Sequence, residues 1–197
     1  MTFYKIDFVP GIGEVNVKTF NLKEISVKEA CRLNEKWHSR LPIIKESNVI
    51  RNTHYICYGA FYGGECFGVA ILSSPVSPSF NGLPIIELRR LAIPETAPKN
   101  TASWILGKVV KRIKLDIPEI EKIISYQDTE VHTGTIYKAA NWKPAIKTKF
   151  ADWNHGTRKR NAPQSKADKI RWEVVIGHKS NRPHKKAQEQ GKIGTWF

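Results

Sequence analysis

The chain has 197 residues, of which 41% are hydrophobic and 25% are charged, so it fits one compact folded domain and is not a wholly disordered chain. No apolar run reaches the length of a membrane span and the first residues lack the layout of a signal peptide, so we expect a cytoplasmic protein without a membrane partner. The net charge of +14 favours a polyanionic partner, and nucleic acid is the expected one.

The positive charge is concentrated near the carboxyl end. Residues 143–197 contain 14 Lys or Arg against 4 acidic residues, a net +10, which leaves only +4 for residues 1–142. Trp153, Trp172 and Trp196 are interleaved with these charges, and bases stack on such rings, although a basic surface that serves only solubility is the alternative. We therefore predict a catalytic domain over 1–150 and a basic, nucleic-acid-binding extension over 151–197. The candidate phosphate contacts are Arg158, Lys159, Arg160, Lys166 and Lys169.

The expected elements alternate between helix and strand. Ser26 and Glu29 form a capping box, which predicts a helix over 27–40. The fold class that follows is a mixed α/β sheet flanked by helices. In chain order, the remaining patterns predict a hairpin of residues 55–61 and 66–72, a central strand over 85–93, a helix from residue 100 or 101, a strand over 120–126, a short helix over 132–141 and an edge strand over 170–176.

The start of the helix after the central strand is a candidate anion site. Its unpaired backbone amides and positive dipole end suit a phosphate. The element resembles in topology the one that binds the pyrophosphate of acetyl-CoA in N-acetyltransferases of the GNAT fold, but it lacks their Gly-rich loop, and an ordinary strand-to-helix turn is the alternative. The candidate cofactor contacts are Asn100, Thr101, Ala102 and Ser103.

A second candidate site follows the strand over 120–126. Asp128 falls where this strand ends, which is where α/β sheets present catalytic side chains, and Tyr137 lies in the next helix. A carboxylate can orient or deprotonate an amine, and a phenol can donate a proton or bind a metal. An aspartate that caps the helix and a tyrosine that only packs are the alternative.

The residues around this site resemble the Mom-like DNA modification proteins of Mu-type bacteriophages. The match comprises Tyr-Gln-Asp at 126–128, His-Thr-Gly-Thr-Ile-Tyr at 132–137 and Ala-Ala-Asn-Trp at 139–142. Weaker support comes from Glu-Leu-Arg-Arg-Leu at 87–91 and His-Ser-Arg-Leu-Pro at 38–42. The resemblance implies a GNAT-like fold and an enzyme that converts adenine in duplex DNA to N6-carbamoylmethyladenine, which protects phage DNA from host restriction.

The resemblance also implies an active-site set of His38, Arg90, Asp128 and Tyr137. Family members tend to follow the histidine with a tyrosine that is suspected to bind iron, whereas this chain has Ser39, so iron dependence stays open. The carbamoylmethyl group is joined through carbon, which simple acetyl transfer does not explain. An acetyl-CoA-derived or a glycine-derived donor fits the product.

Two members of the set can also be interpreted from their own chemistry. His38, with a reference pKa of about 6.5, can act as a base, a metal ligand or a helix cap. Strict alternation places Arg90 on an apolar strand face with Leu88 and Ala92, where it needs Asp128, Glu87 or a ligand as a partner. Arg89 then falls on the opposite face with Glu87, and which arginine enters the site depends on the register.

Two other functions fit the same chain. One is an N-acyltransferase that acts on a protein or small-molecule amine, with the basic extension only locating it on nucleic acid. The other is a non-enzymatic DNA-binding protein on a degenerate acyltransferase scaffold. The sequence does not determine the oligomeric state, a homodimer included.

Overall fold

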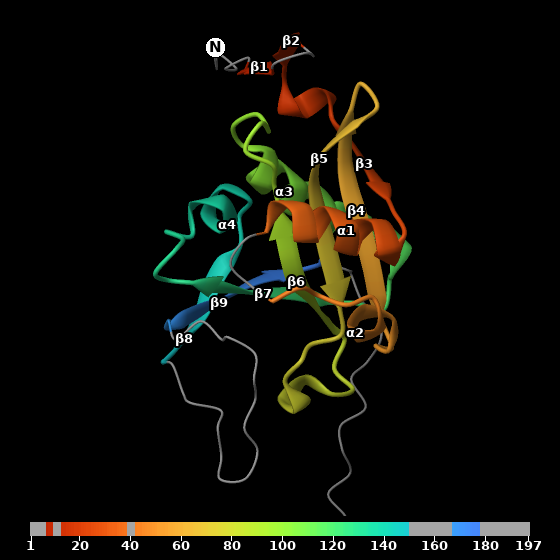
Figure 1. The fold of residues 1–197 in the computed structure, drawn as a ribbon. Helices are drawn as coiled ribbons and strands as arrows, with labels where there is room; N and C mark the ends of the chain where they lie inside the picture. Colours follow the sequence, from red (N-terminus) through yellow and green to blue (C-terminus); the bar gives the residue numbers. More distant parts are fainter. Residues whose placement is uncertain (1–6, 10–12, 39–41, 150–166, 178–197) are drawn as a thin grey trace, which may run out of the picture.

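A seven-stranded mixed sheet organises the computed structural model, which describes residues 7–9, 13–38, 42–149 and 167–177 (Figure 1). The strand order is β3-β4-β5-β6-β7-β9-β8, with β6 and β7 parallel and all other neighbours antiparallel. Strands β1 and β2 form a separate hairpin. The elements are β1 (Asp7–Val9), β2 (Gly13–Val15), η1 (Val17–Thr19), β3 (Asn21–Glu24), α1 (Val27–Trp37), α2 (Ser47–Ile50), β4 (Tyr55–Tyr62), β5 (Glu65–Ser73), η2 (Pro78–Phe80), β6 (Ile85–Ala92), α3 (Thr101–Asp116), β7 (Lys122–Asp128), α4 (Thr135–Ala139), β8 (Lys143–Thr148) and β9 (Lys169–Val175).

Helices cover the two faces of the sheet, so each face carries its own core. Cys31 of α1 packs with Val69 and Ile71 of β5, whereas Leu72 packs with Ile105 of α3 in the larger core on the other face. Figure 1 shows α1 crossing in front of β4 and β5 toward β6, and β8 and β9 lie beyond it. Because both faces of the central strands are buried, β5 is a continuous apolar run rather than an alternating one.

The predicted helices, hairpin and central strand are confirmed, and their starts follow local chemistry. Ser26 Oγ accepts a hydrogen bond from the Glu29 backbone N–H at 3.2 Å, so the predicted cap forms. The other half of the capping box does not form, because the Glu29 carboxylate binds the Arg32 guanidinium at 2.7 and 2.8 Å. Helix α1 ends at Trp37, three residues before the predicted end.

The carboxyl-terminal strand is present, but its predicted position at the sheet edge is wrong. Strand β9 lies between β7 and β8, and Trp172 at its centre is only 2% exposed. The edge is formed by β8, which carries Pro144. Proline is tolerated in an edge strand because the backbone N–H groups on the outer side of that strand have no neighbouring strand to bond. All six residues of β8 are exposed, which explains why the sequence has no apolar strand signal there.

None of the described helices combines the length and apolar character that crossing a bilayer requires.

Candidate active site

The parallel strands β6 and β7 separate near their carboxyl ends. They pair only from Ile85 with Lys122 to Leu88 with Ser125, yet β6 continues to Ala92 and β7 to Asp128. Beyond Ser125, β7 is paired on its other side with β9 alone. Ligands of α/β sheets bind outside the carboxyl ends of such strands, so the split between β6 and β7 is the candidate site.

A β-bulge in β6 determines which residues face this split. Leu88 pairs with Leu72 and Arg90 with Ile71, which leaves Arg89 as one extra residue. Arg90 therefore lies on the α1 side with Ile71, whereas Leu88 belongs to the core under α3. The prediction that Arg90 shares a face with Leu88 is wrong, because the bulge interrupts strict alternation.

The bulge also changes the expected ion pairs. The Glu87 carboxylate lies 3.7 Å from Nε of Arg89, and it accepts a hydrogen bond from the Val76 backbone N–H at 3.1 Å. Burial raises the pKa of Glu87, and the Val76 N–H and the positive charges of Arg89 and Arg90 oppose the rise. Glu87 is thus mainly the partner of Arg89 and of the loop after β5.

Among the described residues, Arg90 is held by carbonyl groups. Its guanidinium donates to the carbonyl of Arg89 at 2.8 Å and, weakly, to that of Pro42 at 3.4 Å. Its buried Nε has no hydrogen-bond partner within the described part of the chain. Burial and the charge of Arg89 lower the pKa of Arg90, and the charge of Glu87 opposes this shift. An anion or a polar ligand would supply a hydrogen-bond acceptor for this Nε.

His38 lies at the end of α1, near enough to Arg90 for its charge to act on the imidazole. It is the C-cap residue of the helix, and its backbone N–H donates to the carbonyl of Asn34 at 2.8 Å. Burial lowers the pKa of His38, and the positive charge of Arg90 lowers it further. His38 is therefore neutral at neutral pH, as a general base must be. Ser39 lies outside the described residues.

Asp128 is the last residue of β7 and points to the same side of the sheet. Ser125 and Gln127 face the core under α3 and α4, so Tyr126 and Asp128 face the side of α1 by alternation. Asp128 Oδ1 accepts a hydrogen bond from the Glu130 backbone N–H at 3.0 Å, which fixes the start of the following turn.

Tyr137 reaches the split from the opposite face. Its ring stacks on Trp172 at a centroid distance of 5.2 Å and leans on Trp142 at 5.7 Å. Its hydroxyl lies 2.9 Å from Ser125 Oγ, which donates to the carbonyl of Leu88 at 3.3 Å. Burial raises the pKa of Tyr137, so the phenol keeps its proton. The structure thus brings His38 and Arg90 together, while the Tyr137 hydroxyl lies on the far side of the sheet at the last paired residues of β6 and β7.

Sequence reasoning missed the residues that hold Tyr137 in place. Gln127 donates through Nε2 to the carbonyl of His132 and accepts from Nε1 of Trp172 at 2.7 Å. Gly134 adopts φ +76 and packs directly against Trp172, which explains the glycine in the motif at 132–137. The available signal was two polar residues, Ser125 and Gln127, at alternate positions of the strand and therefore on one face of it.

The start of α3 keeps two free amide donors. The backbone N–H groups of Ala102 and Ser103 have no acceptor among the described residues, so they fit a phosphate or another small anion. The side chain of Thr101 is not available, because its buried hydroxyl donates to the carbonyl of Pro98 at 2.7 Å. Asn100 occupies the N-cap position with φ +68 and makes no capping hydrogen bond.

A metal finds no ready ligand set in the described part of the chain. There, no three His, Cys, Asp or Glu side chains lie close enough together to hold an ion. The described residues therefore do not fit the iron that the resemblance raised, and we derive no step through it.

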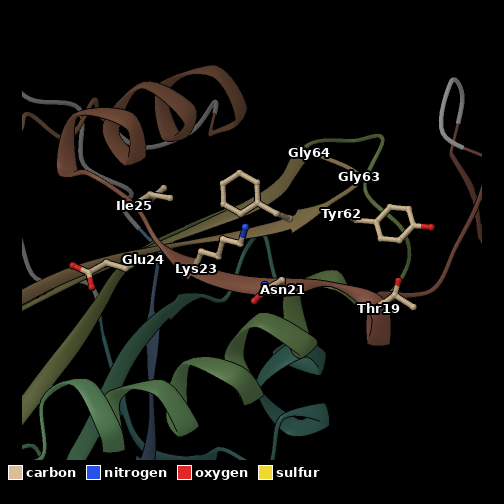
Figure 2. Close-up of a pocket in the computed structure, with 9 residues that line it drawn as sticks. Thr19, Asn21, Lys23, Glu24, Ile25, Tyr62, Gly63 and Gly64 are labelled. Atoms are coloured by element: carbon tan, nitrogen blue, oxygen red, sulfur yellow. The ribbon is translucent and has the colours of Figure 1, made fainter.

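The hollow in Figure 2 lies away from these residues, at the edge strand β3 and the β4–β5 hairpin. It has a volume of about 520 Å³, and the ammonium of Lys23 lies 6.0 Å from the centre of the Phe61 ring in its wall. None of the candidate residues lines it.

The model of the Mom protein family matches residues 19–193. The chain belongs to the Mom protein family. The matched range includes the split between β6 and β7 and all four residues of the predicted active-site set. A search of curated protein sequences finds no match.

Solved structures show that this Mom-family protein has a GNAT acetyltransferase-like fold. The ribosomal-protein-S18-alanine N-acetyltransferase from Escherichia coli superposes with a TM-score of 0.54 at 11% identity, over 84% of this chain and 99% of that one. A variant spermidine N-acetyltransferase from Vibrio cholerae gives 0.58 at 11% identity, over 81% and 95%. A GNAT family acetyltransferase from Elizabethkingia anophelis with acetyl-CoA bound gives 0.55 at 14% identity, over 79% and 97%.

Of the predicted DNA contacts, the structure describes only Lys169. It is the first residue of β9, where it pairs with Asp128 on one side and with Thr148 on the other. Its ammonium is near enough to Glu87 to influence that carboxyl group. Arg158, Lys159, Arg160 and Lys166 lie outside the described residues.

Proposed function

We propose that this Mom-family protein converts adenine in duplex DNA to N6-carbamoylmethyladenine and so protects phage DNA from host restriction. The observation that carries the proposal is the placement of the motif residues of the family around one split in a GNAT-like sheet. His38 and Arg90 lie on the side of α1, and the Tyr137 hydroxyl lies at the last paired residues of β6 and β7.

This placement suits a transfer between two substrates that approach from opposite faces. We assign the target adenine to the α1 side, because neutral His38 there can accept the proton that N6 loses when it bonds to the donor carbon. We assign the donor to the side of α3 and α4. The amides of Ala102 and Ser103, which have no acceptor among the described residues, would bind an acidic group of the donor, and the protonated Tyr137 hydroxyl would donate a hydrogen bond to the donor.

The chain also has the means to bind duplex DNA. Its +14 charge favours phosphate contacts, and the basic residues 158–166 lie between β8 and β9, whose adjoining ends pair beside Asp128. Because N6 cannot be attacked within the stack, the target adenine has to be flipped out of the duplex. We expect the basic segment to grip the backbone while the base enters the split.

The substitution Asp128→Asn tests the proposal with little effect on the fold. Asparagine keeps an oxygen acceptor for the Glu130 N–H and replaces the charged carboxylate with a neutral amide of the same size. We expect mass spectrometry of nucleosides from cells expressing the wild-type protein to detect the modified adenine. The variant should form at least tenfold less of it, while DNA affinity changes by less than about twofold. Unmodified adenine with intact wild-type protein would refute the proposal.

An N-acyltransferase acting on a protein or small-molecule amine is the second candidate. It is favoured by the solved structures, whose names include acetyltransferases for a ribosomal-protein alanine and for spermidine. Incubating the purified protein with acetyl-CoA and either an amine panel or duplex DNA separates the two. Acetylated amine together with unmodified DNA would favour this candidate.

A further inference from the structure

In the described part of the chain, four buried side-chain atoms have no hydrogen-bond partner, and two of them lie between α1 and the sheet, whereas the other two are Nε1 of Trp142 and Nε of Arg171. Of the pair between α1 and the sheet, one is Oδ1 of Asn34, an acceptor on a residue that is 2% exposed, and the other is Nε of Arg90, a donor. Burying such a group without a partner is costly, and native structures leave few of them. An unpaired acceptor and an unpaired donor in one layer indicate a ligand that supplies both complements.

Both atoms lie in the layer between α1 and the sheet. Asn34 is in the last turn of α1, on the buried face that also carries Ala30 and Cys31. Helix α1 packs on β6, and the bulge turns Arg90 toward the α1 side. His38 connects the two, since its backbone N–H bonds to the carbonyl of Asn34 and its pKa responds to Arg90. Figure 1 shows this end of α1 reaching β6.

The complementary ligand has an N–H group next to a hydrogen-bond acceptor. Adenine has this order, with its N6 amino group beside the ring nitrogen N7 or N1. Guanine, with N1–H beside O6, and thymine, with N3–H beside O4, also have this order, so the choice of adenine rests on the proposed function. Cytosine has the order of adenine but is a smaller ring that would fill a purine site poorly.

We propose that Asn34 Oδ1 and Arg90 Nε hold the flipped adenine by its N6 amino group and the adjacent ring nitrogen. The inference rests on the proposed adenine modification and names the residues that recognise the base. N6 carries two hydrogens, so one can stay bonded to Asn34 while the other is lost as the new bond forms. Asn34 is thus a substrate-binding residue that orients the reacting nitrogen.

The test is the substitution Asn34→Leu in the full chain. Leucine has a similar size and no polar atom, so it removes an unpaired buried acceptor, and the melting temperature should stay the same or rise. We expect the modified adenine in cellular DNA to fall about 10- to 100-fold, since leucine cannot accept a hydrogen bond from N6. DNA affinity should change by less than about twofold, because backbone contacts dominate it.

Two further variants keep the test interpretable. Cys31→Ala lies one turn earlier on the same buried face of α1 and should retain modification despite a small loss of stability. Asn34→Ala replaces the leucine variant if the latter fails to fold, and it too should lose modification.

Folded Asn34→Leu protein that modifies adenine at the wild-type level would overturn the inference and leave the proposed function standing. A water molecule as the sole partner of Asn34 predicts that same result. Unmodified adenine with the wild-type protein itself would overturn the proposed function and, with it, this inference.

Discussion

Replacing Gly134 with alanine tests the packing that fixes α4 and Tyr137. Gly134 has φ +76, a conformation that costs an L-residue about 1 kcal/mol. Its new Cβ would lie 2.5 Å from Cζ2 of Trp172 and 2.7 Å from Oε1 of Gln127. Neither neighbour can yield easily, because they are hydrogen-bonded to each other at 2.7 Å and Trp172 stacks on Tyr137.

The expected loss of stability combines two effects. Overpacking of a filled core costs about 1–3 kcal/mol, and the backbone conformation adds about 1 kcal/mol, for a total of about 2–4 kcal/mol. In a chain of this size, 1 kcal/mol shifts the melting temperature by about 2–4 °C, so we expect a decrease of about 4–16 °C. Thermal unfolding followed by circular dichroism measures it.

Gly82→Ala is the matched control for this experiment. Gly82 has nearly the same backbone conformation, φ +75, but a Cβ there would meet no atom within 4 Å. It should therefore show only the conformational part of the destabilisation, about 1 kcal/mol, or about 2–4 °C. If Gly134→Ala melts at the same temperature as Gly82→Ala, the packing against Trp172 does not constrain the motif and the reasoning is wrong.

The geometry of the site leads to three other predictions. The pKa of His38, followed by NMR of its ring protons, should lie below 6.5 and rise when Arg90 is replaced with Gln, because one of the causes that lower it is removed; an unchanged value would contradict their proximity. Tyr137→Phe keeps the stack on Trp172 and removes the hydroxyl, so stability should change by about 1 kcal/mol or less while nucleoside mass spectrometry shows a decrease in modification of at least about tenfold; retained modification would make Tyr137 a packing residue. Replacing the four basic residues of segment 158–166 with Gln should lower the slope of log K against log salt by about 0.9 for each phosphate that the segment no longer neutralises, and an unchanged slope would place DNA binding elsewhere.

Local patterns in the sequence were enough to predict the elements that present the site. The capping residue Ser26 determines where α1 begins, and the apolar run before Asp128 determines where β7 ends. The extent of α1 then places His38 at its carboxyl end. These features depend on neighbours within a few residues, which is why they can be read from one chain.

The orientation of Arg90 could not be predicted, because it depends on pairing with a distant strand. The bulge at Arg89 exists only in the register between β5 and β6, and it moves Arg90 to the opposite face from Leu88. The same limit applies to β9, whose place between β7 and β8 is a long-range choice. A strand with an apolar centre such as Trp172 is more stable inside a sheet than at its edge, and that preference was the one available clue.

The position of β9 links the charge of the chain to its chemistry. Lys169 pairs with Asp128 on one side and with Thr148 on the other, so residues 149–168 leave and re-enter the sheet next to the end of β7. The observed order attaches this segment to the sheet next to Asp128, at the split between β6 and β7. DNA held by this segment would therefore present its backbone next to the split, and a flipped adenine would have only a short distance to travel.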